Sequence, residues 1–127
     1  MTSTKFSKTW KESRQTRKQR KYRFNAPLHV KNKFIASHLS KELKEKHKKR
    51  SITLRRGDKI IVTRGQFSKK TGKVDRIDTK KGRIFVTGIE KTKKDGTKVA
   101  IPLTPSNLMI TELNLEDKKR KESLDRK

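Results

Sequence analysis

The middle of the chain contains, in residues 55–74, two short apolar runs joined by a basic segment, and this stretch limits the fold more than any other. Ile60 and Val62 lie on one face of a two-residue period, which is typical of a strand. Val74 belongs to a returning strand, and Gly65 supplies a turn residue that tolerates positive φ. The stretch therefore predicts a β-hairpin.

A second glycine, Gly72, stands just inside the returning strand and is surrounded by Lys69, Lys70 and Lys73. Glycine weakens a strand unless the strand is bulged or another group must come close to its backbone. The lysines favour a phosphate backbone as that group. The alternative is an ordinary hairpin whose lysines are only solvated.

The hairpin stretch resembles the KOW motif. The resemblance rests on Arg56-Gly57-Asp58 at the entry, the apolar run, Gly65, and Gly72-Lys73-Val74 eight residues after Arg64. Many members have a second glycine in the turn, where Lys69 stands here. The motif occurs in ribosomal proteins and in transcription elongation factors, so it leaves both classes open.

Outside the hairpin the chain is too polar to be packed throughout. At 127 residues and 28% apolar residues, it can form only a modest core, and part of it must be an extension. Lys and Arg number 38 against 13 Asp and Glu, a net charge of +25, and this self-repulsion favours expansion unless a polyanion neutralises it. Nucleic acid is the partner that such a charge predicts.

Two further features of the composition restrict the class of protein. The chain has no cysteine, which excludes disulfides and thiolate metal sites and fits a reducing compartment. It has no apolar run of the length of a signal peptide or a membrane span. We therefore expect a soluble protein of the cytoplasm.

Residues 1–50 are expected to form a basic extension with short helices, because they hold 17 Lys or Arg against three acids. Helix-forming residues run from 13 to 23, with like charges at three- and four-residue spacings that destabilise a helix without a partner. Pro27 is placed for the first turn of a second helix, and Ser40 for the N-cap of a third. We therefore expect this extension to need a contact partner in order to be ordered.

Beyond residue 50 the apolar pattern changes to strand periodicity, in residues 84–89, 98–103 and 108–110. Turn signals stand at Lys80-Lys81-Gly82 and at Asp95-Gly96. Five short strands in about fifty residues favour a small bent barrel over a sandwich. We therefore predict a mainly β chain, with the basic extension at 1–50, a five-stranded SH3-like barrel at 51–115 and a charged tail or frayed helix at 116–127.

Several blocks, in order along the chain, are similar to a single family. They are Arg23–His29, Leu39–Leu43, the hairpin, Pro105–Thr111 and Leu113–Asp117. They resemble the archaeal and eukaryotic form of the universal KOW protein of the large ribosomal subunit, and the short length is similar to that of archaeal members.

The resemblance implies an SH3-like barrel bound to large-subunit ribosomal RNA near its 5′ domain. Members of this family lie close to the exit of the peptide tunnel and, in bacteria, act early in subunit assembly. The chain would then be a monomer within the ribosome, with neighbouring ribosomal proteins as partners. No cofactor, small-molecule substrate or membrane is expected.

RNA binding of this kind is expected to come from neutralised phosphates, with specificity from RNA shape, 2′-hydroxyls and stacked bases. The candidates in the extension are Arg14, Arg17, Lys18, Arg20, Lys21, Arg23, Lys31 and Lys33. Those around the hairpin are Arg55, Arg56, Arg64, Gln66, Lys69, Lys70 and Lys73, with the motif glycines Gly57, Gly65 and Gly72. Any single one of these charges has solvation alone as its alternative role.

Trp10 and Tyr22 are the candidates for stacking on RNA bases, because they lie among cations outside any obvious core. The alternative for both rings is docking against the barrel or against a neighbouring protein. Phe67, near the hairpin tip, is as well suited to packing on the barrel as to stacking on a base.

Catalytic and metal-binding functions find little support. His29, His38 and His47 are nine residues apart, without a cysteine or a pair at metal-ligand spacing. Asp58, Asp75 and Asp78 could hold Mg²⁺ as nuclease carboxylates do, but Asp58 stands in a turn and the other two at a strand end. We expect neither an enzyme nor a metal site.

Three alternatives to a ribosomal protein stay open. The first is the KOW module of a transcription elongation factor that binds RNA polymerase or nascent RNA, although residues 1–50 lack the strands of the α/β domain that normally precedes such a module. The second is a carboxylate-dependent nuclease, which would need Mg²⁺. The third is an architectural chromatin-type protein, which would bind duplex DNA as well as RNA.

Overall fold

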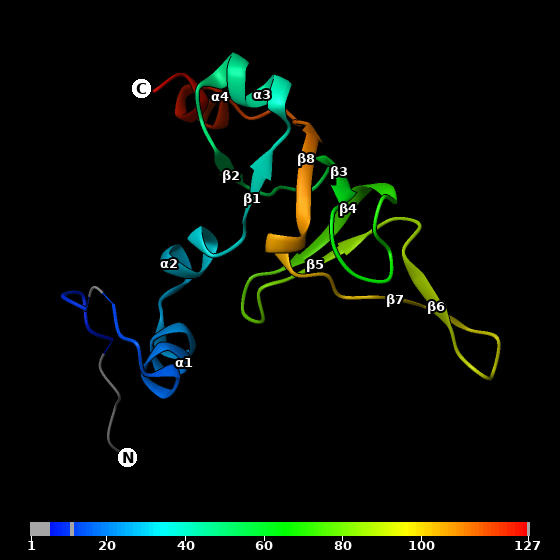
Figure 1. The fold of residues 1–127 in the computed structure, drawn as a ribbon, viewed down its shortest axis with the longest axis horizontal. Coiled ribbons are helices and arrows are strands. Elements are labelled where there is room, and N and C mark those ends of the chain that lie inside the picture. The colour runs from blue at the N-terminus through cyan, green and yellow to red at the C-terminus, as the bar shows by residue number, and fades with distance from the viewer. Residues whose placement is uncertain (1–5, 11, 127) are drawn as a thin grey trace.

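A six-stranded mixed sheet lies at the centre of the computed structural model, which describes residues 6–10 and 12–126 (Figure 1). Its order is β2-β1-β8-β3-β4-β5. The strands are β1 (Ala36–Leu39), β2 (Ser51–Thr53), β3 (Lys59–Val62), β4 (Thr71–Asp78), β5 (Arg83–Val86) and β8 (Leu108–Glu112). β1 and β8 run parallel, whereas every other pair in this sheet is antiparallel.

The predicted hairpin is confirmed as β3 and β4, paired antiparallel. Ile60 and Val62 are buried and Ile61 is half-buried, as their alternation predicted. The apolar face of the hairpin joins a core that draws on the other strands as well. The buried members of this core are Ile35, Leu39, Leu54, Ile60, Val62, Val74, Ile84, Val86, Ile89, Leu108 and Ile110.

The prediction of a mainly β chain with a small five-stranded SH3-like barrel is confirmed only in part, because the chain is mixed α/β with a six-stranded sheet. The described residues hold similar shares of helix and strand, and no closed barrel was detected among them. One cause is β1, a short strand from before residue 50 that lies between β2 and β8. The sheet therefore draws on residues from both sides of residue 50.

The second cause is that the chain leaves the sheet after β5, where Gly88 takes a positive φ of 82°. It then forms a separate ribbon of β6 (Glu90–Thr92) and β7 (Lys98–Ala100), all of whose strand residues are exposed. The chain returns at Leu103, which bridges Ile84 of β5. The segment expected to complete a barrel thus projects from the sheet, on the side away from the N-terminal helices (Figure 1).

The described residues form four α-helices, and the first three confirm the helices expected in the extension. They are α1 (Thr16–Asn25), α2 (Leu28–Lys33), α3 (Lys41–His47) and α4 (Lys118–Asp125), with a 3₁₀ turn η1 (Pro105–Asn107) before β8. Ser40 caps α3 as predicted, since its Oγ accepts the N–H of Leu43 at 3.4 Å. Pro27 stands at the N-cap of α2, just before its first turn. No helix in this part of the chain is long and apolar enough to cross a membrane.

The segment from residue 116, for which the sequence left a charged tail or a frayed helix open, contains helix α4, two of whose side chains are buried. Arg120 and Leu124 of α4 are only 4% and 3% exposed. Asp117 caps the helix, because its Oδ1 accepts the N–H of Lys119 at 2.9 Å. That hydrogen bond, together with the nearby Arg55, lowers the pKa of Asp117 below its ordinary value of 3.8, so the cap is ionised at neutral pH and is lost only in acid.

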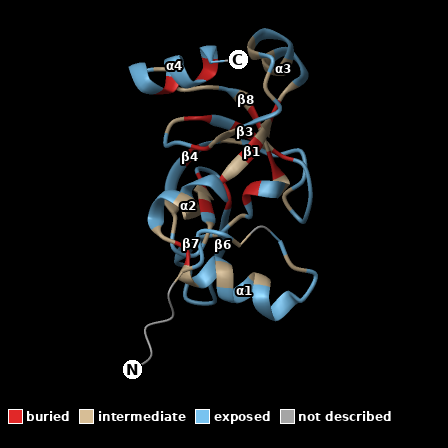
Figure 2. Cartoon of the chain, turned by 90° about the vertical axis from the view of Figure 1, so that its left-hand side faces the viewer, coloured by how far each residue is buried: buried red, intermediate tan, exposed pale blue. Residues whose placement is uncertain are grey.

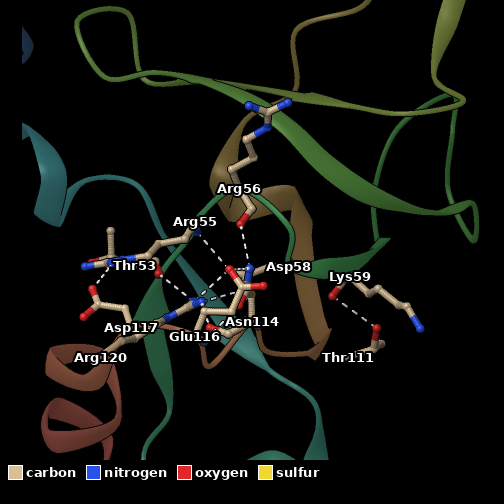
Figure 3. Close-up of polar contacts among 10 residues, drawn as sticks. All are labelled: Thr53, Arg55, Arg56, Asp58, Lys59, Thr111, Asn114, Glu116, Asp117 and Arg120. Carbon is tan, nitrogen blue, oxygen red and sulfur yellow. Dashed lines mark hydrogen bonds and ion pairs between the residues drawn. The ribbon is translucent and has the colours of Figure 1, made fainter.

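A buried ion pair between Asp58 and Arg120 holds α4 in place (Figure 3). Two guanidinium nitrogens of Arg120 donate to the two carboxylate oxygens of Asp58, at 2.6 and 2.7 Å. The same carboxylate accepts the backbone N–H groups of Arg55 at 2.8 Å and of Asn114 at 2.9 Å. Arg120 also donates to the carbonyl oxygens of Asn114 and Thr53. The pair therefore joins residues 53–58 to residues 114–120, and Asp58 and Arg120 themselves are 62 residues apart in the sequence.

Gly72 is required by close packing inside the sheet. A Cβ at this position would lie 2.5 Å from Cγ1 of Val86 and 2.7 Å from the carbonyl oxygen of Thr87. The close approach inferred from the sequence is therefore made by this chain's own β5 and the residue after it. A phosphate is not needed to explain this glycine.

Replacing Arg120 with alanine is expected to lower the free energy of unfolding by about 3–5 kcal/mol, because the carboxylate of Asp58 would stay buried without its partner. Lys121→Ala, at the next and exposed position of α4, is the matched control and should change stability by less than about 0.5 kcal/mol. Urea unfolding of both variants measures the difference. Equal stabilities of the two variants would contradict the assigned role of the pair.

Gly72→Ala is expected to destabilise the protein by about 1–3 kcal/mol, because Val86 or the backbone of Thr87 must move to admit the methyl group. Thr71→Ala, at the preceding exposed position of β4, is the comparison for an alanine in this strand whose side chain is exposed, and its own cost is the lower strand propensity of alanine. Both can be compared by thermal unfolding. A Gly72→Ala protein as stable as Thr71→Ala would show that the space above this glycine is not filled.

Candidate nucleic-acid interface

Helix α1 presents a dense set of exposed positive charges. Its ten residues contain no acid. Its five basic residues are exposed, and all five are among the candidates predicted from the sequence: Arg17, Lys18, Arg20, Lys21 and Arg23. Arg14, just before the helix, and Lys33 of α2 are exposed too, whereas Lys31 is half-buried. The arm, meaning residues 6–10 and 12–34, therefore carries the predicted cations on its surface (Figure 2).

Aromatic rings hold the arm together, since none of the ion pairs found among the described residues involves it. Trp10 stacks on Tyr22 at 4.1 Å between ring centroids, and Phe6 lies 5.0 Å from Tyr22 on a tilted plane. Phe34, at the end of α2, meets Tyr22 edge-on at 6.4 Å. The two rings proposed for stacking on RNA thus stack on each other, and base stacking by them stays a prediction.

A basic groove lies between the arm and the turn that joins β4 to β5. It has a volume of about 510 Å³, and its walls include Arg23 and Lys31 from the arm. The opposite wall brings Lys80, Lys81 and Arg83, none of which was among the residues expected to bind RNA. Arg83 is oriented by a 3.2 Å hydrogen bond to Oγ1 of Thr104. The groove thus combines cations from segments about fifty residues apart.

The turn between β3 and β4 carries the next group of candidates. Arg64, Gln66, Lys69 and Lys70 are all exposed there. Lys69 has a φ of 69°, so it occupies the left-handed conformation that glycine favours, at the position where many KOW sequences have glycine. Phe67 packs against the core instead of projecting from the turn. Lys70 lies over this ring, with Nζ 5.2 Å from its centroid.

Two of the candidate cations have acidic partners within the chain. Arg55 pairs with Asp117, and Arg56 lies 3.8 Å from Asp75 across an exposed surface. Both arginines line a second groove, of about 630 Å³, between α2 and the segment after β8. Lys73 is exposed on β4. The structure therefore brings Arg55 and Arg56 together, but partly neutralises them.

The motif glycines have different structural roles. Gly57 and Gly65 take positive φ values of 94° and 99°, and Gly72 is in close contact with β5. Gly57 donates its N–H to the carbonyl oxygen of Val74 at 2.9 Å, which joins the start of the hairpin to the returning strand. All three therefore support the shape of the hairpin.

The carboxylates considered as Mg²⁺ ligands are not grouped around a common metal site. Asp58 is paired with Arg120, Asp75 is near Arg56, and Asp78 accepts the N–H of Lys81 at 3.1 Å. Among the described residues no three His, Cys, Asp or Glu side chains gather as metal ligands. These carboxylates thus serve the fold of the loops around the basic surface.

Comparison with known proteins relates the chain to a family of ribosomal proteins. A family profile of ribosomal proteins, covering eukaryotic L26 and its archaeal counterpart L24, matches residues 13–127. The large ribosomal subunit protein uL24 of Methanospirillum hungatei is 49% identical over 112 residues, which are 88% of this chain and 93% of that protein. The uL24 of Methanosphaera stadtmanae is 44% identical over 115 residues, or 91% of this chain and 98% of the other.

The matched region covers α1, the whole sheet and α4, whereas a shared KOW hairpin alone would match only its middle. The resemblance noted in the sequence is thereby confirmed. The chain belongs to the uL24 family of ribosomal proteins, which comprises eukaryotic L26 and its archaeal counterparts.

Proposed function

We propose that this structural protein of the large ribosomal subunit binds large-subunit ribosomal RNA through a discontinuous basic surface. That surface comprises α1, the basic groove and the β3–β4 turn. As the family implies, its RNA partner would be the region near the 5′ domain, close to the exit of the peptide tunnel, and binding would occur early in subunit assembly. Neighbouring ribosomal proteins are further partners, and the place of action is the ribosome in the cytoplasm.

The observation that carries the proposal is the unpaired charge of the folded chain. With a net charge of +25, only four ion pairs form among the described residues, and none of them lies in α1 or in the β3–β4 turn. The cations of α1 and of the β3–β4 turn are exposed, and Lys80, Lys81 and Arg83 add exposed cations at the groove. A polyanion that follows this surface would neutralise them together.

Binding by this surface is driven by the release of counterions from the RNA phosphates. Each Lys or Arg that reaches a phosphate steepens the dependence of affinity on salt, without reading the base sequence. Specificity then comes from the shape of the RNA and from its unpaired bases, because side chains do not enter the narrow major groove of duplex RNA. The separated arm, groove and turn suit a folded RNA better than a straight duplex.

The same surface explains how α1 can be stable in the ribosome. Lys and Arg side chains at three- and four-residue spacings repel one another along its exposed side, and its N-cap residue, Gln15, makes no side-chain capping bond. Phosphates placed beside these side chains would turn repulsion into attraction. We therefore propose that α1 is stabilised by the RNA that it binds.

The same observations give less support to the other functions considered from the sequence. An elongation factor shares the KOW hairpin but not the arm, and the family match includes the arm from residue 13 onward. A nuclease would need carboxylates that gather around a metal ion, and ribosomal protein families are not enzymes. No separate observation favours a chromatin-type protein.

The proposal predicts how the affinity for a transcript of the large-subunit ribosomal RNA depends on salt. Arg17→Ala combined with Lys21→Ala should weaken binding and reduce the slope of log affinity against log salt by about 1.5, since each lost phosphate contact removes about 0.7–0.9. Filter binding at several KCl concentrations measures the slope.

Lys59→Ala is the matched control, because Nζ of Lys59 already pairs with Glu112 at 2.7 Å, and its slope should stay near that of the unmodified protein. The proposal would be wrong if the unmodified chain bound this RNA no better than an unrelated RNA of equal length. It would also be wrong, for α1, if the double variant kept the full slope.

A further inference from the structure

Phe24 is the most exposed of the large apolar side chains in the described part of the chain, at 81%. It lies in the last turn of α1, two residues after Tyr22. Two residues correspond to about 200° around a helix, so the two rings point to nearly opposite sides. Tyr22 packs among Trp10, Phe6 and Phe34, whereas Phe24 is in no ring contact found among the described residues.

The surroundings of Phe24 are strongly basic. Arg17, Arg20 and Lys21 stand seven, four and three residues before it, which places them on the same helical face, and all three are exposed. Helix α1 contains no acid. A partner for this face must therefore carry negative charge and also offer a flat apolar surface to a ring.

The position of Phe24 beside the basic groove further restricts the kind of partner that could contact it. Arg23, the residue before it, forms part of the groove wall together with Lys31, Lys80 and Lys81. A strand whose phosphates follow this groove passes the end of α1. A base turned out of that strand would meet Phe24, because Trp10 and Tyr22 already cover each other.

We propose that Phe24 stacks on an unpaired base of the ribosomal RNA, while phosphates of the same strand lie in the basic groove. This inference rests on the proposed function, since it names the contact that the RNA makes at one point of the surface. The base must be unpaired, because duplex bases are stacked within the helix and present only their edges. Stacking requires a π-face and not a particular base, so Phe24 would favour a local RNA shape over a sequence.

The test uses the full-length chain and a transcript of the large-subunit ribosomal RNA from the source organism. Phe24→Ala should weaken binding by about 5- to 100-fold, the range for loss of one base–aromatic stack, with an unchanged salt slope. Alanine is a better helix former than phenylalanine, so weaker binding cannot be explained by loss of α1. Arg20→Ala, on the same face, should show the opposite pattern, with a shallower slope.

Two further variants separate stacking from apolar contact. Phe24→Trp should bind within about threefold of the unmodified protein, and Phe24→Leu should be as weak as Phe24→Ala, because leucine has no π-face. Leu28→Ala, which removes another exposed apolar side chain close by on α2, is the matched control and should bind normally. Near-equal affinities of Phe24→Leu and the unmodified chain would overturn the proposal.

The outcomes also separate this proposal from the function on which it rests. If the unmodified chain binds the transcript and Phe24→Ala binds it equally well, stacking by Phe24 is wrong while RNA binding stands. If Phe24→Ala weakens incorporation into assembled subunits but not binding to the naked transcript, Phe24 contacts a neighbouring protein, and stacking is again wrong. If the unmodified chain does not bind the transcript, the proposed function itself fails.

Discussion

Positive charge that cannot be neutralised within the chain is the constraint on which the rest of this structure depends. The chain has a net charge of +25, and only four ion pairs form among the described residues. The apolar residues suffice for one sheet and its cover, and most of the cations are left at the surface. The fold is therefore a small apolar core with cations on its surface. The core stabilises the folded chain, and the surface cations are available to bind RNA.

Within that constraint, the ion pair of Asp58 and Arg120 shows what it takes to bury one cation. Both oxygens of the carboxylate and two nitrogens of the guanidinium are occupied, and backbone groups of Thr53 and Asn114 add further hydrogen bonds, while Nε of Arg120 is buried without a partner among the described residues. The result is that the start of the hairpin, the end of β2 and helix α4 are fixed to one another (Figure 3). Most other cations have no such site and stay at the surface, where RNA can reach them.

The local features of the fold could be predicted from the sequence, because they depend on neighbouring residues. The β3–β4 hairpin follows from alternation, and the start of α3 from the hydroxyl of Ser40. Strand β1 could not be predicted in this way, because its position depends on distant segments. It pairs with β2 and β8, and Ser37 within it donates a 2.6 Å hydrogen bond to the carbonyl oxygen of Pro105. The docking of α4 depends in the same way on Asp58, 62 residues before Arg120.

The same distinction applies to the candidate interface. That the cations of α1 and of the hairpin turn are exposed follows from their type, and the contact that each makes with RNA stays a prediction. Lys80, Lys81 and Arg83 were missed because only the folded chain brings the β4–β5 turn opposite Arg23 and Lys31. Phe24 was missed because spacing alone does not show which of several rings will pair with one another and which will be left exposed.

The most direct test of the account is amide hydrogen exchange on the full-length protein, free and bound to large-subunit ribosomal RNA. The account predicts that amides of β1, β3 and β8 are protected in both states, whereas those of α1 exchange rapidly in the free protein and become protected on the RNA. Equal protection of α1 with and without RNA would contradict the claim that this helix is stabilised by the phosphates it neutralises.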